Sequence, residues 1–303
     1  MGNELSLQQY YESRKSMIDK AVKEFLEKES LMGISETPLG GKRLRGVLVL
    51  LICEALGGKP DQAMDAAIAI ELAHAASLDA DDIVDLDTLR RGKPATWVVK
   101  GVAKAAVGSH GLVAASFNLI RKYGFEAVDI FIETYGKMVK GEIHDVIRGG
   151  FYEAIVGAKT ASLWAAAAAL GALAAGRRDY VNLSREYGYA VGMAFQIADD
   201  IVDVAKLVEK GEITRIIKHP SSAAFIAYLG LESLIRTTPF QVLARGLKVI
   251  EESMKNAAME KLDQWVRHAQ GLAAQFPDSK YKKLLEEYPT MAVDLMFKEA
   301  GWK

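Results

Sequence analysis

The sequence is poor in several features that define protein classes. Its only cysteine is Cys53, which excludes an intramolecular disulfide framework and is typical of a reducing, cytoplasmic compartment. Its 303 residues include seven prolines, and the alternating Val, Ile and Thr runs that are typical of strands are scarce. Excess positive charge is also absent, because 38 Lys and Arg face 39 Asp and Glu. The formal net charge of −1 gives no general basic field, so nucleic-acid binding is not expected.

Long hydrophobic runs are absent as well. The N-terminal segment Met1–Lys28 is polar and charged and has no apolar core of the signal-peptide kind. The most apolar stretch, Ala161–Gly176, is shorter than the roughly 20 residues that a membrane-spanning helix needs. We therefore expect a buried, closely packed helix there and no transmembrane segment.

What the sequence does contain favours an all-α protein. Half of the residues are hydrophobic, with Ala and Leu frequent, so the chain can bury a large core. No linker or solenoid period interrupts it, and we expect a single helical domain over residues 1–303. Helices are predicted at Leu5–Glu29, Arg43–Leu56, Asp61–Asp85, about Val99–Tyr123, Phe125–Ile147, Phe151–Ala175 and Asp179–Val208. A loop is expected at Glu209–Pro220, with helical periodicity again beyond Ser221.

One acidic phrase, DDIVD, occurs twice, at residues 81–85 and 199–203. On a helix, carboxylates three or four residues apart share a face, so each copy can point its acids into one space. Hard oxygen ligands suit Mg²⁺, which is commonly shared with substrate phosphates. The expected substrate is therefore a diphosphate ester. The alternative to a metal site is a solvated acidic helix end. Two copies of the phrase, both beside apolar helices, favour the metal site over this alternative. The candidate metal ligands are Asp81, Asp82, Asp85, Asp199, Asp200 and Asp203.

Two basic segments supply the counterpart of these acids. Residues 40–45 read GGKRLR, which places cations at a glycine-rich loop and a helix start, where backbone N–H groups also favour anions. Residues 90–93, RRGK, follow the first acidic phrase directly. Either segment alone is compatible with ordinary surface charge. Together they predict two phosphate-binding sites around the metal site.

These motifs resemble those of the trans-type prenyl diphosphate synthases, the family of farnesyl and geranylgeranyl diphosphate synthases. The match covers roughly residues 30–205 and keeps the order and approximate spacing of the family. It rests on Gly40–Arg45, His74–Asp85, Leu89–Pro94, Lys159-Thr160 and Phe195–Asp203. The resemblance implies an isoprenoid-synthase-type helical bundle around a deep central cavity, and commonly a homodimer, to which Val99–Tyr123 is expected to contribute.

The resemblance also implies a reaction and a role for each matching residue. Members bind an allylic diphosphate through Mg²⁺ at both acidic motifs and condense it with isopentenyl diphosphate by ionisation, condensation and elimination. By position, the six aspartates would hold the metal, and Arg90 and Lys159 the allylic diphosphate. Thr160 and Gln196 would line the reacting centre. The isopentenyl diphosphate would be held by Lys42, Arg45, His74 and Arg91.

The chain departs from the family pattern in three places. After the second acidic motif, Gly211-Glu212-Ile213-Thr214 has Glu where the family has Lys, and the loop is short. Lys206, Lys210 or Lys218 are candidates to replace the missing lysine. Residues 141–145 read GEIHD where many short-chain members have Gly-Gln, and Asp79 adds an acid before the first motif.

Small residues before the first motif predict a long product. Ala76, Ala73 and Ala69 lie roughly on one helical face, and Ala76 and Ser77 stand where short-chain members have bulky aromatics. We expect a product of C20 or longer, unless these alanines only permit close packing and another residue such as Phe117 forms the floor. Two other functions stay open: a class I terpene cyclase or other ionisation-initiated prenyltransferase, and a non-catalytic modulating subunit of a synthase.

Overall fold

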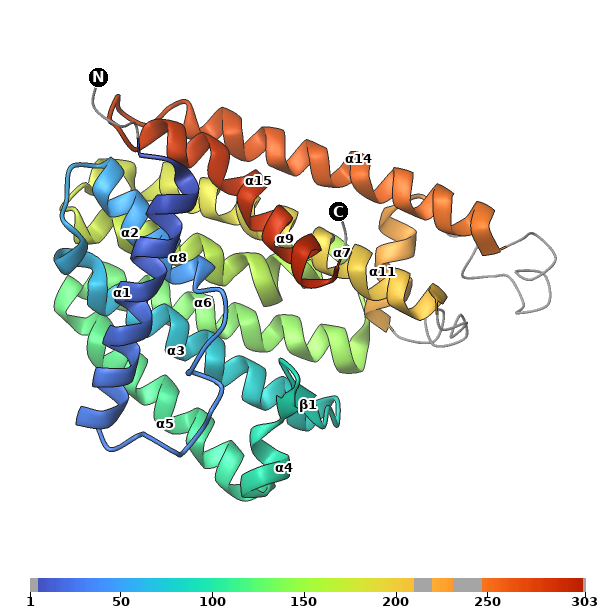
Figure 1. The fold of residues 1–303 in the computed structure, drawn as a ribbon, viewed down its shortest axis with the longest axis horizontal. Helices are drawn as coiled ribbons and strands as arrows, with labels where there is room; N and C mark the ends of the chain where they lie inside the picture. Colours follow the sequence, from blue (N-terminus) through green and yellow to red (C-terminus); the bar gives the residue numbers. More distant parts are fainter. Residues whose placement is uncertain (1–4, 210–219, 232–246, 302–303) are drawn as a thin grey trace. The chain divides into compact units, whose positions relative to one another are not determined.

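The computed structural model describes residues 5–209, 220–231 and 247–301 (Figure 1). Nearly all regular structure in these ranges is helical, which confirms the prediction of an all-α protein. The chain divides into two compact units, described separately below. The first comprises Met1–Ile132, Ala166–Arg185 and Phe276–Leu284, and the second comprises Glu133–Ala165, Glu186–Gln275 and Leu285–Lys303. The expectation of a single domain stays a prediction.

The first unit is built mainly from the N-terminal helices. They are α1 (Leu7–Lys28), α2 (Leu44–Ala55), α3 (Pro60–Val84), α4 (Thr96–Lys100), α5 (Val102–Ile120) and the 3₁₀ turn η1 (Arg121–Tyr123). Helix α1 begins where Ser6 and Gln9 satisfy each other's backbone N–H groups in a capping box. Helix α3 begins with Pro60 in its first turn, a position where proline removes no helical hydrogen bond.

The core of the first unit depends on small residues and on one buried acid. All residues of α2 are buried, and α3 lies alongside α5 (Figure 1). A Cβ at Gly171 would lie 2.5 Å from the Val49 carbonyl oxygen, so the two backbones touch there. The Glu54 carboxylate accepts hydrogen bonds from Tyr10, Arg14 and Tyr281, which ties α1 and the segment before α15 to α2.

Between α3 and α4 lies a small hairpin that the sequence analysis did not predict. Strands β1 (Leu89–Arg90) and β2 (Lys93–Pro94) pair antiparallel around a two-residue turn. Both turn residues have positive φ, 53° at Arg91 and 72° at Gly92, as the favoured two-residue hairpin turns require. A second difference is at Gly101, whose φ of 84° divides the predicted helix at about Val99–Tyr123 into α4 and α5.

The second unit contains η2 (His144–Arg148), α7 (Tyr152–Val156), η3 (Gly157–Ala161), α11 (Pro220–Tyr228) and α14 (Leu247–Ala273). Four helices are divided between the two units: α6 (Phe125–Ile143), α8 (Ser162–Ala174), α9 (Val181–Glu209) and α15 (Lys282–Glu299). The 3₁₀ turn η4 (Arg178–Tyr180) belongs to the first unit. The prediction of uniform helices at Phe125–Ile147 and Phe151–Ala175 was incomplete, because η2 and η3 are π-helical turns. Such π turns occur frequently at functional sites. Of the predicted loop at Glu209–Pro220, residues 210–219 lie outside the described ranges.

The core of the second unit surrounds α9. Ile197, Ala198 and Ile201 belong to one buried cluster with apolar side chains of α11, α14 and α15. A Cβ at Gly192 would lie 2.8 Å from the Cα of Ala161, so α9 contacts the end of η3 backbone to backbone. This close contact fixes the part of α9 that leads into the second acidic motif.

Within the described residues, one helical stretch, Tyr152–Ala174, is long and apolar enough to cross a membrane by length and composition. It is longer than the segment expected from the sequence. Of its most apolar window, 78% is buried inside the protein, which core helices of soluble proteins also show. The expectation that the chain has no transmembrane segment stays a prediction.

Candidate active site

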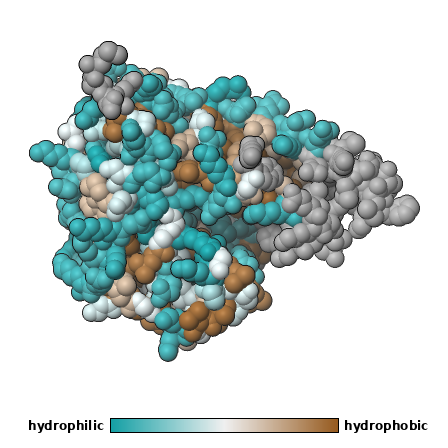
Figure 2. All heavy atoms as spheres, viewed as in Figure 1, coloured by the Kyte–Doolittle hydropathy of each residue, from teal (hydrophilic) through white to brown (hydrophobic). Residues whose placement is uncertain are grey.

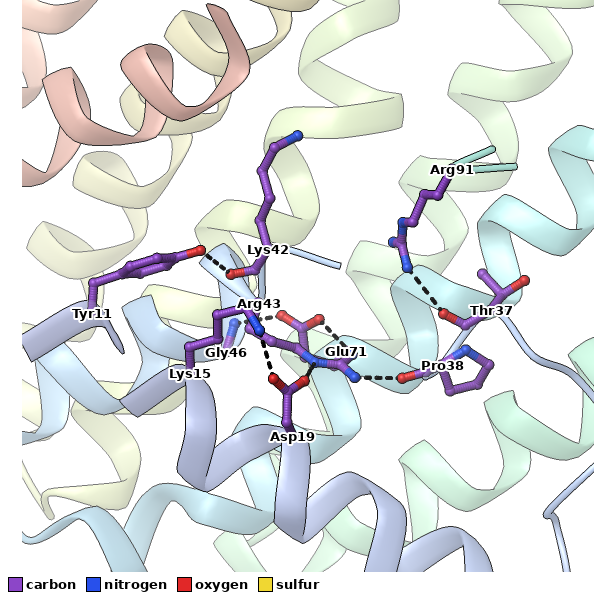
Figure 3. A network of polar contacts seen from close by, with 10 residues as sticks. All are labelled: Tyr11, Lys15, Asp19, Thr37, Pro38, Lys42, Arg43, Gly46, Glu71 and Arg91. Atoms are coloured by element: carbon purple, nitrogen blue, oxygen red, sulfur yellow. Dashed lines mark hydrogen bonds and ion pairs between the residues drawn. The ribbon is translucent and has the colours of Figure 1, made fainter. Parts of the chain in front are cut away.

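The basic loop before α2 is held from inside the first unit by Arg43 (Figure 3). Arg43 is buried and has a positive φ of 56°. Its guanidinium donates to Asp19 Oδ1 at 2.8 Å, to Glu71 Oε2 at 3.3 Å and to the Pro38 carbonyl at 2.5 Å. Glu71 also accepts from the Gly46 N–H at 2.8 Å. This network fixes the loop on α1, α2 and α3, so Arg43 is structural rather than a free anion-binding group.

The turn of the hairpin brings the second basic segment against the first. Arg91 Nη1 donates to the Thr37 carbonyl at 3.3 Å, and a Cβ at Gly41 would lie 2.8 Å from Arg91 Cζ. A side chain at position 41 would displace this guanidinium, and the φ of 91° at Gly41 also favours glycine there. Figure 3 shows Lys42 extending away from the Arg43 network, while its carbonyl accepts from the Tyr11 hydroxyl at 2.8 Å. The two basic segments thus meet at Gly41 and Arg91.

His74 lies on α3 within reach of the charges of this basic cluster. Burial lowers the pKa of its imidazole well below its ordinary value, and the nearby positive charges lower it further. The contributing groups are the guanidinium groups of Arg45, Arg91, Arg90 and Arg43. The imidazole is therefore neutral at pH 7 in the absence of an anion. A diphosphate bound here would offset the positive charge that keeps it neutral.

The first acidic motif divides between the protein interior and solvent. Asp82 is buried, and both Nε and Nη2 of Arg90 donate to its Oδ1. Its Oδ2 has no hydrogen-bond partner among the described residues. Asp81 is partly exposed, and Asp85, at the end of α3, is exposed. Asp81 and Asp85 are thus the more open candidate ligands of this motif, while Arg90 is engaged by Asp82.

The layer of α3 before this motif is closely packed. Ala76 is buried, its carbonyl accepts from the Ser109 hydroxyl of α5, and Ser77 bonds back to the His74 carbonyl. Asp79 is also buried, and it accepts hydrogen bonds from Thr37 and Thr96 at 2.5 and 2.9 Å. The extra acid noted in the sequence therefore joins the basic loop and α4 to α3.

In the second unit, a chain of hydrogen bonds connects the reacting-centre candidates to the second acidic motif. Thr160 Oγ1 donates to Gln196 Oε1 at 2.9 Å, and Gln196 Nε2 donates to Asp200 Oδ1 at 3.1 Å. The Tyr152 hydroxyl donates to Asp200 Oδ2. No motif in the sequence pointed to Tyr152. These contacts fix the orientation of both carboxylate oxygens of Asp200.

The second motif concentrates negative charge. The pKa of Asp200 is raised to about 8, mainly by burial and also by the neighbouring carboxylates of Asp199 and Asp203, while its hydrogen bonds with Tyr152 and Gln196 act in the opposite direction. Asp203 is exposed and lies 3.4 Å from Lys206 Nζ. Of the other residues named for this region, Lys210, Lys218 and Gly211–Thr214 lie outside the described residues.

Lys159 contacts two acids of α6 and η2. Its Nζ lies 2.6 Å from Glu142 Oε2 and 2.8 Å from Asp145 Oδ2. The sequence marked residues 141–145 as a departure from the family pattern but gave these acids no role. Their contact with Lys159 depends on the packing of η3 against α6.

Comparison with known proteins identifies the family. Residues 28–213 match the polyprenyl synthetase family. The chain belongs to that family. A hexaprenyl pyrophosphate synthase of Saccharolobus solfataricus is 31% identical over 254 residues, which cover 78% of this chain and 90% of that protein. A geranylgeranyl diphosphate synthase of Methanosarcina mazei is 35% identical over 211 residues, 63% of this chain and 65% of that protein, slightly under two thirds of its length. The transferase class predicted from the sequence, that of the prenyl diphosphate synthases, is confirmed.

Solved structures of this polyprenyl synthetase family have the same fold. The geranylgeranyl pyrophosphate synthetase of Geoglobus acetivorans has a TM-score of 0.79 at 24% identity, and the alignment covers 94% of this chain and 99% of that one. A polyprenyl synthase of Caulobacter crescentus, complexed with calcium and isoprenyl diphosphate, has a TM-score of 0.74 at 25% identity, with coverage of 97% and 99%. The isoprenoid-synthase-type helical fold is thereby confirmed.

The acidic motifs of this synthetase have the donor chemistry for a magnesium ion but do not form a complete cage. In the part of the chain that the structure describes, no three acidic, histidine or cysteine side chains converge on one point. Mg²⁺ commonly keeps water and phosphate oxygens as ligands, so one or two carboxylates suffice. The orphaned Oδ2 of Asp82 and the charge crowding around Asp200 are both compatible with a bound cation.

Proposed function

We propose that the protein condenses isopentenyl diphosphate with an allylic prenyl diphosphate and releases a product of C20 or longer. The observation that carries this proposal is the cluster of Lys42, Arg45, His74 and Arg91 in the first unit, which is separate in the chain from Lys159. A condensing enzyme must hold two diphosphates, whereas a cyclase holds one. The Caulobacter crescentus relative crystallised with isoprenyl diphosphate supports a diphosphate ligand.

The cluster around Gly41 would hold the isopentenyl diphosphate. Arg45 and Arg91 are always charged at physiological pH, and Arg91 can shift its weak bond from the Thr37 carbonyl to a phosphate oxygen. His74 would donate a hydrogen bond whether or not it takes up a proton, which fixes the orientation of the substrate. The buried side chains of Asp79 and Arg43 would hold the loop before α2 in position through their hydrogen bonds.

Lys159, Thr160 and Gln196 would act on the allylic substrate. Lys159 would stabilise the negative charge that grows on the departing diphosphate, with Arg90 as a second cation. Thr160 and Gln196 would present oxygen atoms toward the allylic cation. Mg²⁺, held by Asp81 and Asp85 with Asp82, and by Asp199 and Asp200 with Asp203, would supply further charge stabilisation for the leaving diphosphate. The product diphosphate is the proposed base for the final proton.

Incubation of the purified protein with Mg²⁺, isopentenyl diphosphate and each allylic diphosphate, followed by sizing of the products, tests this proposal. We expect elongated prenyl diphosphates and release of inorganic diphosphate. Cyclised hydrocarbon without use of isopentenyl diphosphate would favour the terpene cyclase. If the protein shows no turnover by itself but stimulates an added synthase, the modulating subunit is favoured.

Arg45→Ala and Arg91→Ala should each weaken isopentenyl diphosphate use by about tenfold or more, since hydrogen bonds to charged groups are worth about 1.5–3 kcal/mol.

The metal requirement is a separate prediction. Asp81→Ala and Asp199→Ala should abolish turnover while the far-ultraviolet circular dichroism stays unchanged, because neither partly exposed side chain packs in the core. EDTA should stop the reaction and added Mg²⁺ should restore it. Full activity in EDTA would contradict the metal assignment for both motifs.

We also propose a homodimer in the cytoplasm. Exposed apolar side chains gather over α4 and the start of α5 (Figure 2), and they include Val98, Val99, Val102 and Val107. Patches of this kind commonly mark protein interfaces. The cytoplasmic location rests on the single cysteine, which is typical of a reducing compartment.

A further inference from the structure

Lys159 is shared between two carboxylates in a setting that is neither exposed nor deeply buried. The side chains of Lys159, Glu142 and Asp145 are 26%, 24% and 13% exposed. Water screens an ion pair at this depth less than it screens a surface pair. The two contacts, at 2.6 and 2.8 Å, have the length of charge-assisted hydrogen bonds. Lys159 is therefore engaged before any substrate arrives.

The backbone builds this arrangement. A Cβ at Gly141 would lie 2.5 Å from the backbone nitrogen of Lys159, so α6 and η3 touch at this point. Glu142 and Asp145 are three residues apart and share a helical face. The backbone contact at Gly141 places the Lys159 side chain beside these two carboxylates. Two π-helical turns, η2 and η3, contribute Asp145 and Lys159.

The charges in this cluster do not balance. One ammonium faces two carboxylates, and the outer oxygens, Glu142 Oε1 and Asp145 Oδ1, are buried without a hydrogen-bond partner in the described part of the chain. One acid would suffice to neutralise the lysine. The second leaves an excess negative charge beside the group that the proposed function assigns to an anionic substrate, and this charge opposes anion binding.

We propose that Glu142 is a positioning residue that limits how strongly Lys159 binds the allylic diphosphate before ionisation. This inference rests on the proposed function. To reach Lys159, the diphosphate has to displace a carboxylate, which weakens ground-state binding. As the carbon–oxygen bond breaks, the leaving diphosphate takes the electron pair and gains charge, so it competes better for the ammonium. The contact then stabilises the transition state more than the bound substrate, and inorganic diphosphate leaves readily.

Glu142→Gln tests this role because it keeps an oxygen that can accept from Lys159 and removes one charge. The Michaelis constant for the allylic diphosphate and the dissociation constant for inorganic diphosphate should each fall about threefold to tenfold. This effect lies between the free-energy contribution of an exposed ion pair and that of a hydrogen bond to a buried charge. The turnover number should not rise. The Michaelis constant for isopentenyl diphosphate should change by less than about twofold, since neither Glu142 nor Lys159 is among its proposed ligands. Asp145→Asn should act in the same direction.

Two further variants show whether the effect passes through Lys159. In a Lys159→Met background only the direct repulsion between Glu142 and the anion is left, so Glu142→Gln should raise the calorimetric affinity for inorganic diphosphate by less than about twofold. Glu133→Gln removes a glutamate of the same helix that pairs with Lys137 at the surface, and it should change neither constant. The inference is wrong if Glu142→Gln leaves diphosphate affinity unchanged or lowers it, or if the gain in affinity without Lys159 is as large as the gain with it. If neither the wild type nor any variant binds diphosphate or condenses substrates, the proposed function fails as well. Normal turnover with unshifted constants overturns the inference alone.

Discussion

At the scale of single residues, Arg43 orders the basic loop from inside the protein. Its neighbours Lys42 and Arg45 were assigned to substrate from the sequence, and nothing in the GGKRLR phrase separates Arg43 from them. The difference comes from its positive φ and from the carboxylates of Asp19 and Glu71, which come from α1 and α3. A residue's role in this loop is therefore set by where two distant helices place their acids.

Arg43→Met should destabilise the fold and weaken isopentenyl diphosphate binding together. Glu71 would stay buried without its cation, and breaking a buried pair costs about 3–5 kcal/mol. The free energy of unfolding in denaturant measures this loss. Lys23→Met removes the long, exposed contact between Lys23 and Glu27 and should change that free energy by less than about 0.5 kcal/mol. Equal effects of the two variants would contradict the role given to Arg43.

His74 gives the protein a dependence on pH. Because its pKa is lowered in the folded state, the unfolded chain binds the proton first as the pH falls below about 6.5. The stabilising contribution of the neutral ring is thus present above that pH and is lost as the pH falls toward the folded-state pKa. His74→Asn should remove up to about 1.4 kcal/mol per pH unit from the slope of the unfolding free energy below pH 6.5. Denaturant titrations at several pH values check this, and an unchanged slope would show that folding does not lower the pKa of His74.

At the scale of elements, α3 carries both the first candidate metal-binding motif and the residues that are proposed to limit product length. Ala69, Ala73 and Ala76 are all at most 1% exposed. The Ser109 hydroxyl reaches the carbonyl of Ala76, so α5 packs close to this layer. One helical turn rises about 5.4 Å, comparable with one isoprene unit, so each layer of α3 can set one elongation step. Phe117 and Phe131 form an edge-to-face pair and are the alternative floor.

Ala76→Phe should shorten the product by at least one isoprene unit. An aromatic ring in a packed layer is not displaced without a cost of about 1–3 kcal/mol, so the ring blocks the chain. Sizing of the products by mass spectrometry checks this, and thermal unfolding separates a blocked tunnel from a damaged fold. Ala80→Phe, at an exposed position of the same helix, should leave product length unchanged. A wild-type product of C15, or an unchanged distribution in the Ala76 variant, would show that another element sets the length.

At the scale of the whole molecule, the surface of α6 supports assembly. Phe125, Ile132 and Val139 recur at intervals of seven residues and are 89%, 54% and 46% exposed. A heptad spacing of apolar side chains is typical of helices that pair with a partner. Apolar periodicity in the sequence did not separate this stripe from core residues, because both follow the helical repeat.

Ile132→Glu should convert the expected homodimer into a monomer. A buried isoleucine contributes about 1.5–3 kcal/mol to association, and a symmetric contact loses two such isoleucines, one from each protomer. Each glutamate would also place a charge in the buried contact. Light scattering at micromolar concentration measures the mass. Lys20→Glu, on the exposed face of α1, serves as the charge control and should stay dimeric. An active wild type of monomeric mass would contradict the proposed assembly.

The sequence alone determined the helical class, most helix positions and the two acidic motifs, because these depend on local periodicity and on residue chemistry. It also marked the GGKRLR and RRGK segments as two candidate phosphate-binding sites. Only the tertiary structure decided which residues of those motifs face inward. Asp82 pairs with Arg90 because a hairpin with two positive φ angles turns the chain back on α3, and Lys159 pairs with Glu142 because Gly141 lets two backbones touch. Such contacts join side chains of different elements, and they depend on backbone geometry that helical periodicity does not encode.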